Sequence, residues 1–419
     1  MKKTNIIAMA LAGLMTLPVI AGEASEPTAG DILQGINMFT PEDGDPAYKV
    51  KANEQYGTQW AVDAAYGYWN TNKAISGTNR HTNLFLIHAQ LNQRLIENTV
   101  HGGTWLRAEF SGSWGLDRRS AKSGTWFTDG YANASGLHAD ALGPHDGVIP
   151  ELAVMQYFNH KRACVIAGMV NLTNYFDAVS IANDSYSSFT NDGFINTTIV
   201  PLPDANLGAV FQYELDDNDY VMLGVSRTGC EYGDNPFTSD DINGYVVVGE
   251  WGHIFADGDA TFRLNPFYQR LDVDFGDERG EHKRSNWGLA ASIEYAVNDM
   301  CTVYSRAGLA HHDHIDGNAG EVSVGANFKL IPSREDDFFG ISYGIFKGAV
   351  NNYRGYPAYL SDEDGESHGN RREQVLELMY SFQVNDYLKL VPHFQYIKNP
   401  AYRDVSSESI CGVQAVFSF

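Results

Sequence analysis

The sequence has 419 residues, of which 43% are hydrophobic and 12% aromatic, and its 29 Lys and Arg against 52 Asp and Glu give a formal net charge of −23. So acidic a chain lacks the basic face with which proteins bind the phosphates of a nucleic acid, and we expect no nucleic-acid partner. The apolar and aromatic content also excludes a disordered chain.

The N-terminus has the pattern of a secretory signal peptide. Lys2 and Lys3 precede an apolar stretch from Ile6 to Ile20, and small residues follow it. No later run reaches the roughly 18 consecutive apolar residues of a membrane-spanning helix. We therefore expect a signal peptide at 1–21, an N-terminal periplasmic segment at 22–57 and a transmembrane domain at 58–419.

An alternation with a period of two continues through most of the remaining chain. Between positions 321 and 330 the even positions are apolar and the odd ones polar or small, and 287–296, 376–382 and 388–396 show the same pattern. Successive side chains of a strand point to opposite faces, so each range predicts a strand with one apolar and one polar face.

Two kinds of connection alternate between these strands. Short turns rich in Asn, Asp and Gly lie at 159–162, 216–219, 257–259, 297–299 and 384–386. Long polar loops lie at about 116–150, 172–205, 228–243, 273–286, 311–318, 349–372 and 397–408. Outer-membrane barrels have short periplasmic turns and long extracellular loops, so the chain is predicted to form an all-β, antiparallel transmembrane barrel of about sixteen strands.

The alternation also predicts what each face of the barrel contacts. Lipid offers no hydrogen bonds, so the apolar side chains should face outward and the polar ones should line the pore. Aromatic residues near strand ends, such as Trp287, Tyr295 and Tyr396, would form girdles at the membrane interfaces. The chain ends on Phe419, a terminal aromatic residue of the kind that barrel-assembly machinery recognises.

Several blocks of the sequence resemble a known family. The segment 388–400, with Pro392-x-x-Gln395-Tyr396 and a final Asn-Pro, resembles the penultimate strand of OprB-type carbohydrate-selective porins. The strand 305–308, the segment 325–337 with its Pro-x-Arg-x-x-Asp, and the loop 171–206 resemble the family in the same order, over about 150–419. The family's N-terminal Trp-Gly-x-Arg stretch is not found between 23 and 57. The resemblance implies an outer-membrane porin that passes sugars by diffusion, often as a homotrimer.

Charged residues on the polar faces are the candidates for sugar contacts, because Arg and carboxylate groups hydrogen-bond sugar hydroxyls. They are Arg107, Glu109, Glu250, Arg263, Glu294 and Arg306, with Glu321, Lys329, Glu377 and Lys389 as further pore-wall charges. The alternative is that they are solvated wall charges that pair across strands. Arg306 is the first choice because it lies in a block that resembles the family.

Two loops are long enough to fold inward and narrow the pore, with an exposed loop as the alternative. The loop 172–205 carries Tyr175, Phe176 and Phe194, whose aromatic faces could stack on sugar rings. The loop 116–150 is an equal competitor by length.

Other kinds of site find less support. His311, His312, Asp313 and His314, with Asp316, have the composition of a metal site, but a solvated loop is the simpler interpretation. The four cysteines form no CxxC pair and no Gly-x-Ser-x-Gly motif is present, so we expect no cofactor, no metal and no enzyme.

The expected partners are small sugars, outer-membrane lipid and lipopolysaccharide, and barrel-assembly machinery. A general or cation-preferring porin is the main alternative function, with a hydrolase or an adhesin behind it.

Overall fold

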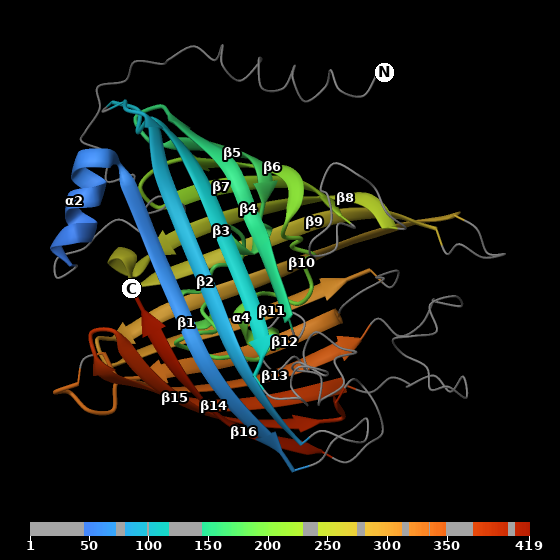
Figure 1. Ribbon diagram of the computed structural model, residues 1–419. Helices are drawn as coiled ribbons and strands as arrows, with labels where there is room; N and C mark the ends of the chain where they lie inside the picture. Colours follow the sequence, from blue (N-terminus) through green and yellow to red (C-terminus); the bar gives the residue numbers. More distant parts are fainter. Residues whose placement is uncertain are drawn as a thin grey trace.

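The computed structural model describes residues 46–72, 80–98, 100–116, 145–228, 242–274, 281–311, 318–334, 336–348, 372–400 and 407–419. Sixteen strands close into one barrel (Figure 1). The strands are β1 Thr58–Thr71, β2 His81–Ile96, β3 Thr104–Gly115, β4 His145–Phe158, β5 Ala163–Val170, β6 Asn206–Glu214, β7 Asp219–Thr228, β8 Ile242–Phe255, β9 Ala260–Asp274, β10 Glu281–Asn298, β11 Cys301–Ala310, β12 Asn318–Phe328, β13 Phe338–Gly348, β14 Arg372–Asn385, β15 Leu388–Lys398 and β16 Glu408–Ser418.

Every strand is antiparallel to the next one, and β1 closes the barrel against β16. Asp63 lies opposite Ser418 in this last pair, and the backbones of Val62 and Phe419 exchange hydrogen bonds of 3.1 and 2.9 Å. The predicted fold class and strand number are therefore confirmed.

Two of the predicted loop boundaries are wrong. The predicted loop 116–150 includes six residues of β4, where Val148 pairs with Ser111, and the predicted loop 273–286 includes the beginning of β10, where Lys283 pairs with Asp272. Polar residues at these ends had suggested loops. Where two paired strands extend beyond the apolar band, their backbone hydrogen bonds continue although their side chains are polar. Composition alone therefore misplaces the ends of such strands.

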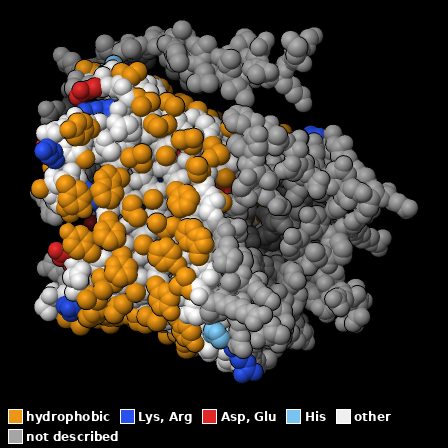
Figure 2. Space-filling view, viewed as in Figure 1, with side chains coloured by type: hydrophobic (Ala, Val, Ile, Leu, Met, Phe, Trp, Pro, Cys, Tyr) orange, Lys and Arg blue, Asp and Glu red, His pale blue; other side chains and the backbone are white. Residues whose placement is uncertain are grey.

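The outer surface of the barrel carries the apolar faces of the strands. On β10, Trp287, Leu289 and Ile293 are exposed while Ser292 between them is buried; on β12, Val322 is exposed. Figure 2 shows the resulting band of hydrophobic side chains over the described surface. The predicted apolar outer face is confirmed, and it has the character of a surface that contacts lipid.

One short turn is fixed by a network of polar contacts. Asp337, before β13, accepts two hydrogen bonds from Arg334, at 2.5 Å from Nε and 3.0 Å from Nη2. The same carboxylate accepts the backbone N–H of Gln383 on β14 at 2.9 Å, and Arg334 donates to the Gln383 carbonyl at 2.5 Å. These are the Arg and Asp of the Pro-x-Arg-x-x-Asp block. The block therefore joins the β12–β13 turn to β14.

The N-terminal segment contributes a helix that the alternation did not predict. Helix α2 (Ala47–Tyr56) ends at Gly57, which has a φ of +62° and donates its N–H to Asn53 at 2.9 Å. Glycine adopts this left-handed conformation without strain, so the chain turns sharply into β1. Among the described residues, no helix is long and apolar enough to cross a membrane.

Candidate functional site

The segment 171–205, here called the inner loop, leaves β5 and returns to β6 through the interior of the barrel. It contains two single turns of 3₁₀ helix, Leu172–Asn174 and Ser180–Ala182, and the short helix α4 (Asp192–Ile195), which lies inside the barrel (Figure 1). The prediction that the loop 172–205 folds inward is thus met by the geometry. The competing loop lies outside the described residues from position 117 to 144.

Aromatic side chains pack the inner loop against one half of the barrel wall. Phe194 lies with its ring centroid 6.2 Å from that of Phe346 on β13, and Phe189 lies 5.9 Å from Phe194 and 6.4 Å from Tyr304 on β11. The same cluster includes inward-facing wall residues of the first and last strands, namely Trp69, Leu84, Leu86, Val375, Val391, Ile397, Ile410 and Val416. The expectation of a purely polar interior is therefore wrong, because these apolar wall residues cover the apolar side of the loop.

A second apolar cluster packs the inner loop against the other half of the wall. Leu172, Tyr175, Phe176 and Ile199 of the loop pack with wall residues of β3 to β10. Gly224 on β7 makes room for this contact, since a Cβ there would lie 2.7 Å from the Phe176 ring. Burial of each large apolar side chain contributes about 1.5–3 kcal/mol, so the two clusters hold the loop firmly.

Glutamates of the wall bind the backbone of the inner loop. Four of them accept a loop N–H: Glu250 from Asp177 at 2.8 Å, Glu294 from Ser180 at 3.0 Å, Glu321 from Thr198 at 2.8 Å and Glu377 from Thr190 at 2.9 Å. Two more accept loop side chains, because Asn174 donates to Glu109 at 2.6 Å and to Glu151 at 3.0 Å. An ionised acceptor makes such bonds roughly twice as strong as neutral ones.

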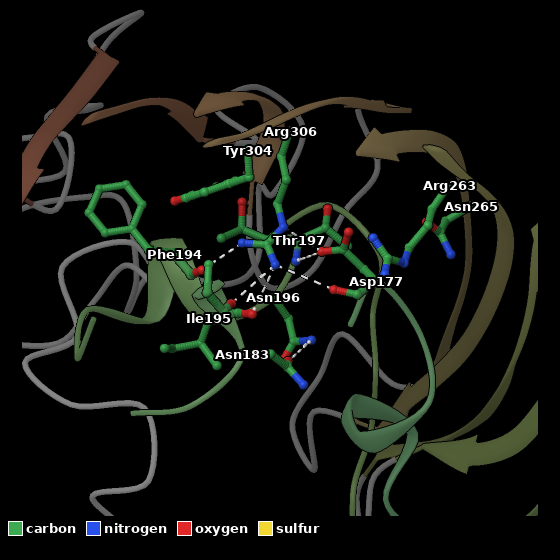
Figure 3. A network of polar contacts seen from close by, with 12 residues as sticks. Asp177, Asn183, Phe194, Ile195, Asn196, Thr197, Arg263, Asn265, Tyr304 and Arg306 are labelled. Atoms are coloured by element: carbon green, nitrogen blue, oxygen red, sulfur yellow. Dashed lines mark hydrogen bonds and ion pairs between the residues drawn. The ribbon is translucent and has the colours of Figure 1, made fainter. Parts of the chain in front are cut away.

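Arg306 on β11 binds the centre of the inner loop. Its Nε lies 2.7 Å from Oδ2 of Asp177, and Nη1 donates to the Phe194 carbonyl at 2.5 Å. Nη2 donates to the carbonyls of Asp177, Ala182 and Ile195 at 3.3, 3.2 and 3.1 Å. Figure 3 shows the guanidinium surrounded by these groups. With a residue exposure of 1%, Arg306 is buried between the wall and the loop, and its contacts position the loop.

The other predicted pore residues lie in the same layer. Arg107 forms an ion pair of 2.9 Å with Glu151 and lies 5.5 Å from the Tyr175 ring, and Arg263 lies 3.7 Å from Glu294. All eight residues proposed for sugar contact are buried inside the barrel: Arg107, Glu109, Tyr175, Phe176, Glu250, Arg263, Glu294 and Arg306. The structure brings them together around the inner loop. Direct contact of any of them with a sugar stays a prediction.

The exposed face of the inner loop is polar and mostly uncharged. Ser180 and Asp184 are exposed, and the half-buried polar side chains of the loop are Thr173, Asn174, Asn183, Ser187, Asp192, Asn196, Thr198 and Asp204. Asp184 lies close enough to Asp63 on β1 for their charges to interact. Among the described residues, these polar side chains are the part of the loop that is accessible to solvent.

Two residues of the site were missed by the sequence analysis. Asp177, the ion-pair partner of Arg306, lies 129 residues from it in the chain, and Glu151 lies one residue beyond the predicted loop 116–150. Nothing local in the sequence connects Asp177 with β11. An acidic residue between apolar positions of a loop was the only available signal.

The histidine cluster falls largely outside the described residues. Only His311 is described, and its ring stacks on Trp287 with centroids 5.4 Å apart. In the described part of the chain, no three potential ligands gather in the geometry of a metal site. Of the cysteines, Cys164, Cys301 and Cys411 are described and form no disulfide.

Comparisons with known proteins agree with this architecture. Residues 148–419 match the family described as "Carbohydrate-selective porin, OprB family". The high pH structure of Pseudomonas putida OprB superposes with a TM-score of 0.69 at 14% identity and covers 89% of this chain and 96% of that one. The outer membrane channel DcaP of Acinetobacter baumannii has a TM-score of 0.50 at 11% identity, with 86% and 97% covered.

One curated relative is also similar over a short stretch. An uncharacterized protein of Aquifex aeolicus is 34% identical over 67 residues, or 16% of this chain and 22% of that protein. The matching stretch thus spans about a fifth of that relative's length.

Proposed function

Because the chain belongs to the OprB family of carbohydrate-selective porins, we propose that it forms a passive channel for neutral sugars, narrowed by the inner loop. The observation that carries this proposal is that the loop lies fixed inside a closed barrel, and that most of its exposed and half-buried polar side chains are hydroxyls and amides. Such groups exchange hydrogen bonds with sugar hydroxyls without a net charge. Binding of this kind is weak enough to allow release, as conduction requires.

The charged residues of the barrel wall support this proposal because they bind the inner loop. Glu250, Glu294, Glu321 and Glu377 accept N–H groups of the inner loop, and Arg306 donates to its carbonyls. These groups therefore fix the width of the passage. The sugar then meets the loop surface and not the carboxylates of these wall glutamates.

The proposed location is an outer membrane, with the short turns facing the periplasm. The apolar outer band and the alternation of short and long connections support this orientation. Lipopolysaccharide contacts, insertion by barrel-assembly machinery and a homotrimer remain predictions. A passive channel of this build performs no chemical step, and we propose no catalytic residue.

A cation-preferring porin is the second candidate, and one observation favours it. Asp184 is exposed at the inner loop, and its charge acts on that of Asp63 on β1. Two carboxylates at a constriction attract cations and repel anions. The two functions differ in how the channel responds to sugar and to a salt gradient.

Liposome swelling and planar-bilayer recording separate these functions. A sugar channel should admit glucose and maltose faster than a neutral polyol of equal size, and sugar should reduce its ion conductance. Asp184→Asn should change the reversal potential in a salt gradient and leave sugar rates intact. Strong cation preference without any sugar block would favour the second candidate.

A further inference from the structure

Helix α2 is the described element whose role the channel does not explain. It lies at the short-turn end of the barrel, beside the start of β1 and outside the ring of strands (Figure 1). Its Tyr48 ring stacks on Trp60 with centroids 6.0 Å apart and an interplanar angle of 24°, and Lys49 places its Nζ 4.8 Å from the centre of the same ring.

Trp60 belongs to the outward face of β1. The inward residues of this strand include the buried Gln59 and Ala65, while Trp60 alternates with them and shares its face with the exposed Tyr66 and Tyr68. Tyr66 and Tyr68 are exposed on the apolar outer face of the barrel, so α2 packs at the edge of that face. The helix surface continues the membrane face at the short-turn end.

The composition of α2 fits the headgroup layer and not the hydrocarbon. It has no buried residue and no apolar stripe, so it does not insert. It carries Lys49 and Lys51 against a single acid, Glu54, in a chain whose net charge is −23. Tyr48 and Tyr56 are exposed at 51% and 68%, and tyrosine is the side chain enriched at membrane interfaces.

We propose that α2 is a binding surface for the headgroups of anionic phospholipids in the periplasmic leaflet. Lys49 and Lys51 contact the lipid phosphates, and Tyr48 and Tyr56 lie at the level of the glycerol groups. Trp60 holds the helix in the plane of the membrane. The attraction of a basic side chain to an anionic surface corresponds to about a fivefold preference per lysine.

The test uses the full chain reconstituted in nanodiscs of equimolar phosphatidylcholine and phosphatidylglycerol. Lipids that stay bound on extraction are counted by native mass spectrometry. Wild-type protein should retain phosphatidylglycerol above its bulk share, and Lys49→Gln/Lys51→Gln should lower the ratio of bound phosphatidylglycerol to bound phosphatidylcholine by about 25-fold, the product of two such lysines. Lys49→Arg/Lys51→Arg, which keeps both charges, should retain it.

Lys161→Gln is the matched control, because Lys161 is an exposed lysine of the β4–β5 turn at the same end of the barrel and packs toward Gly102 and Tyr157. It should leave the lipid ratio unchanged. Single-channel conductance of every variant reports that the barrel is intact. An equal lipid ratio in wild type and the Gln variant would overturn the proposal. So would a change of oligomeric state without a change in bound lipid, since a second copy would then cover α2.

Discussion

Replacing Arg306 by Met tests whether the wall charges hold the inner loop. The change removes the ion pair of 2.7 Å with Asp177 and the donors to the carbonyls of Phe194, Ala182 and Ile195. It leaves the Asp177 carboxylate, only 1% exposed, without its cation. Breaking a buried pair on one side costs about 3–5 kcal/mol, well above the roughly 1 kcal/mol of an ordinary hydrogen bond.

The loss of these Arg306 contacts should destabilise the position of the inner loop and leave the barrel folded. The backbone of Arg306 pairs with Ser292 and Ser323, and the substitution leaves those ladders in place. We therefore expect the barrel to fold and the inner loop to loosen. Single-channel conductance should rise with added current noise, and the loop should become accessible to protease.

The double variant Arg306→Met/Asp177→Asn is the control. Removal of both charges leaves no unpaired ion, and such replacements are often close to neutral in stability. It should recover much of the wild-type conductance. The reasoning is refuted if the single variant keeps wild-type conductance and protease resistance, or if the double variant is as loose as the single one.

Three further changes test other contacts. Glu377→Gln removes the charge that binds two loop N–H groups and should weaken the loop by about 1–3 kcal/mol, seen as current noise without loss of the barrel. Gly193→Ala places a Cβ 2.7 Å from the Phe346 ring and should cost about 1–3 kcal/mol by overpacking; an unchanged melting temperature and protease pattern would contradict this. The hydrogen bond from Arg334 holds the pKa of Asp337 below its ordinary value of 3.8. Its contribution is present above that value and is lost as the pH falls through the lower folded-state pKa. Wild type should lose more thermal stability than Asp337→Asn on acidification below about pH 4, and parallel curves would count against the contact.

The barrel itself could be predicted from the sequence because its rule is local. Period-two alternation in 321–330 and 287–296 follows from lipid on one side of each strand, and the exposed Val322 and Trp287 confirm it. The inner residues follow no such rule. Val391 and Ile410 face inward although they are apolar, because they pack in the cluster formed around Phe189 and Phe194.

The candidate site could be predicted only in part for a related reason. The alternation of polar and apolar positions identifies the inward-facing charged residues. Their role depends on which residues of a distant segment lie next to them in the fold. Arg306 was predicted to contact sugar. In the structure it forms an ion pair with Asp177, and no sequence spacing connects Asp177 with β11. Exposure of the loop side chains depends on how the loop folds inside the barrel, so Ser180 and Asp184 could not be singled out.

The attachment of the inner loop has a consequence for biogenesis. Its anchors are spread over strands from β3 to β16, and Gln414 on the last strand donates to the Ser185 carbonyl at 3.0 Å across 229 positions of the chain. The wall surface that binds the inner loop is incomplete until the C-terminal strand has joined β1. Until closure, the cluster around Phe189 and Phe194 therefore lacks its partners on the last strands, and contacts so distant in sequence form slowly. A chain arrested before closure exposes apolar surface and is therefore prone to aggregation. Rapid pairing of β16 with β1 shortens the lifetime of this intermediate.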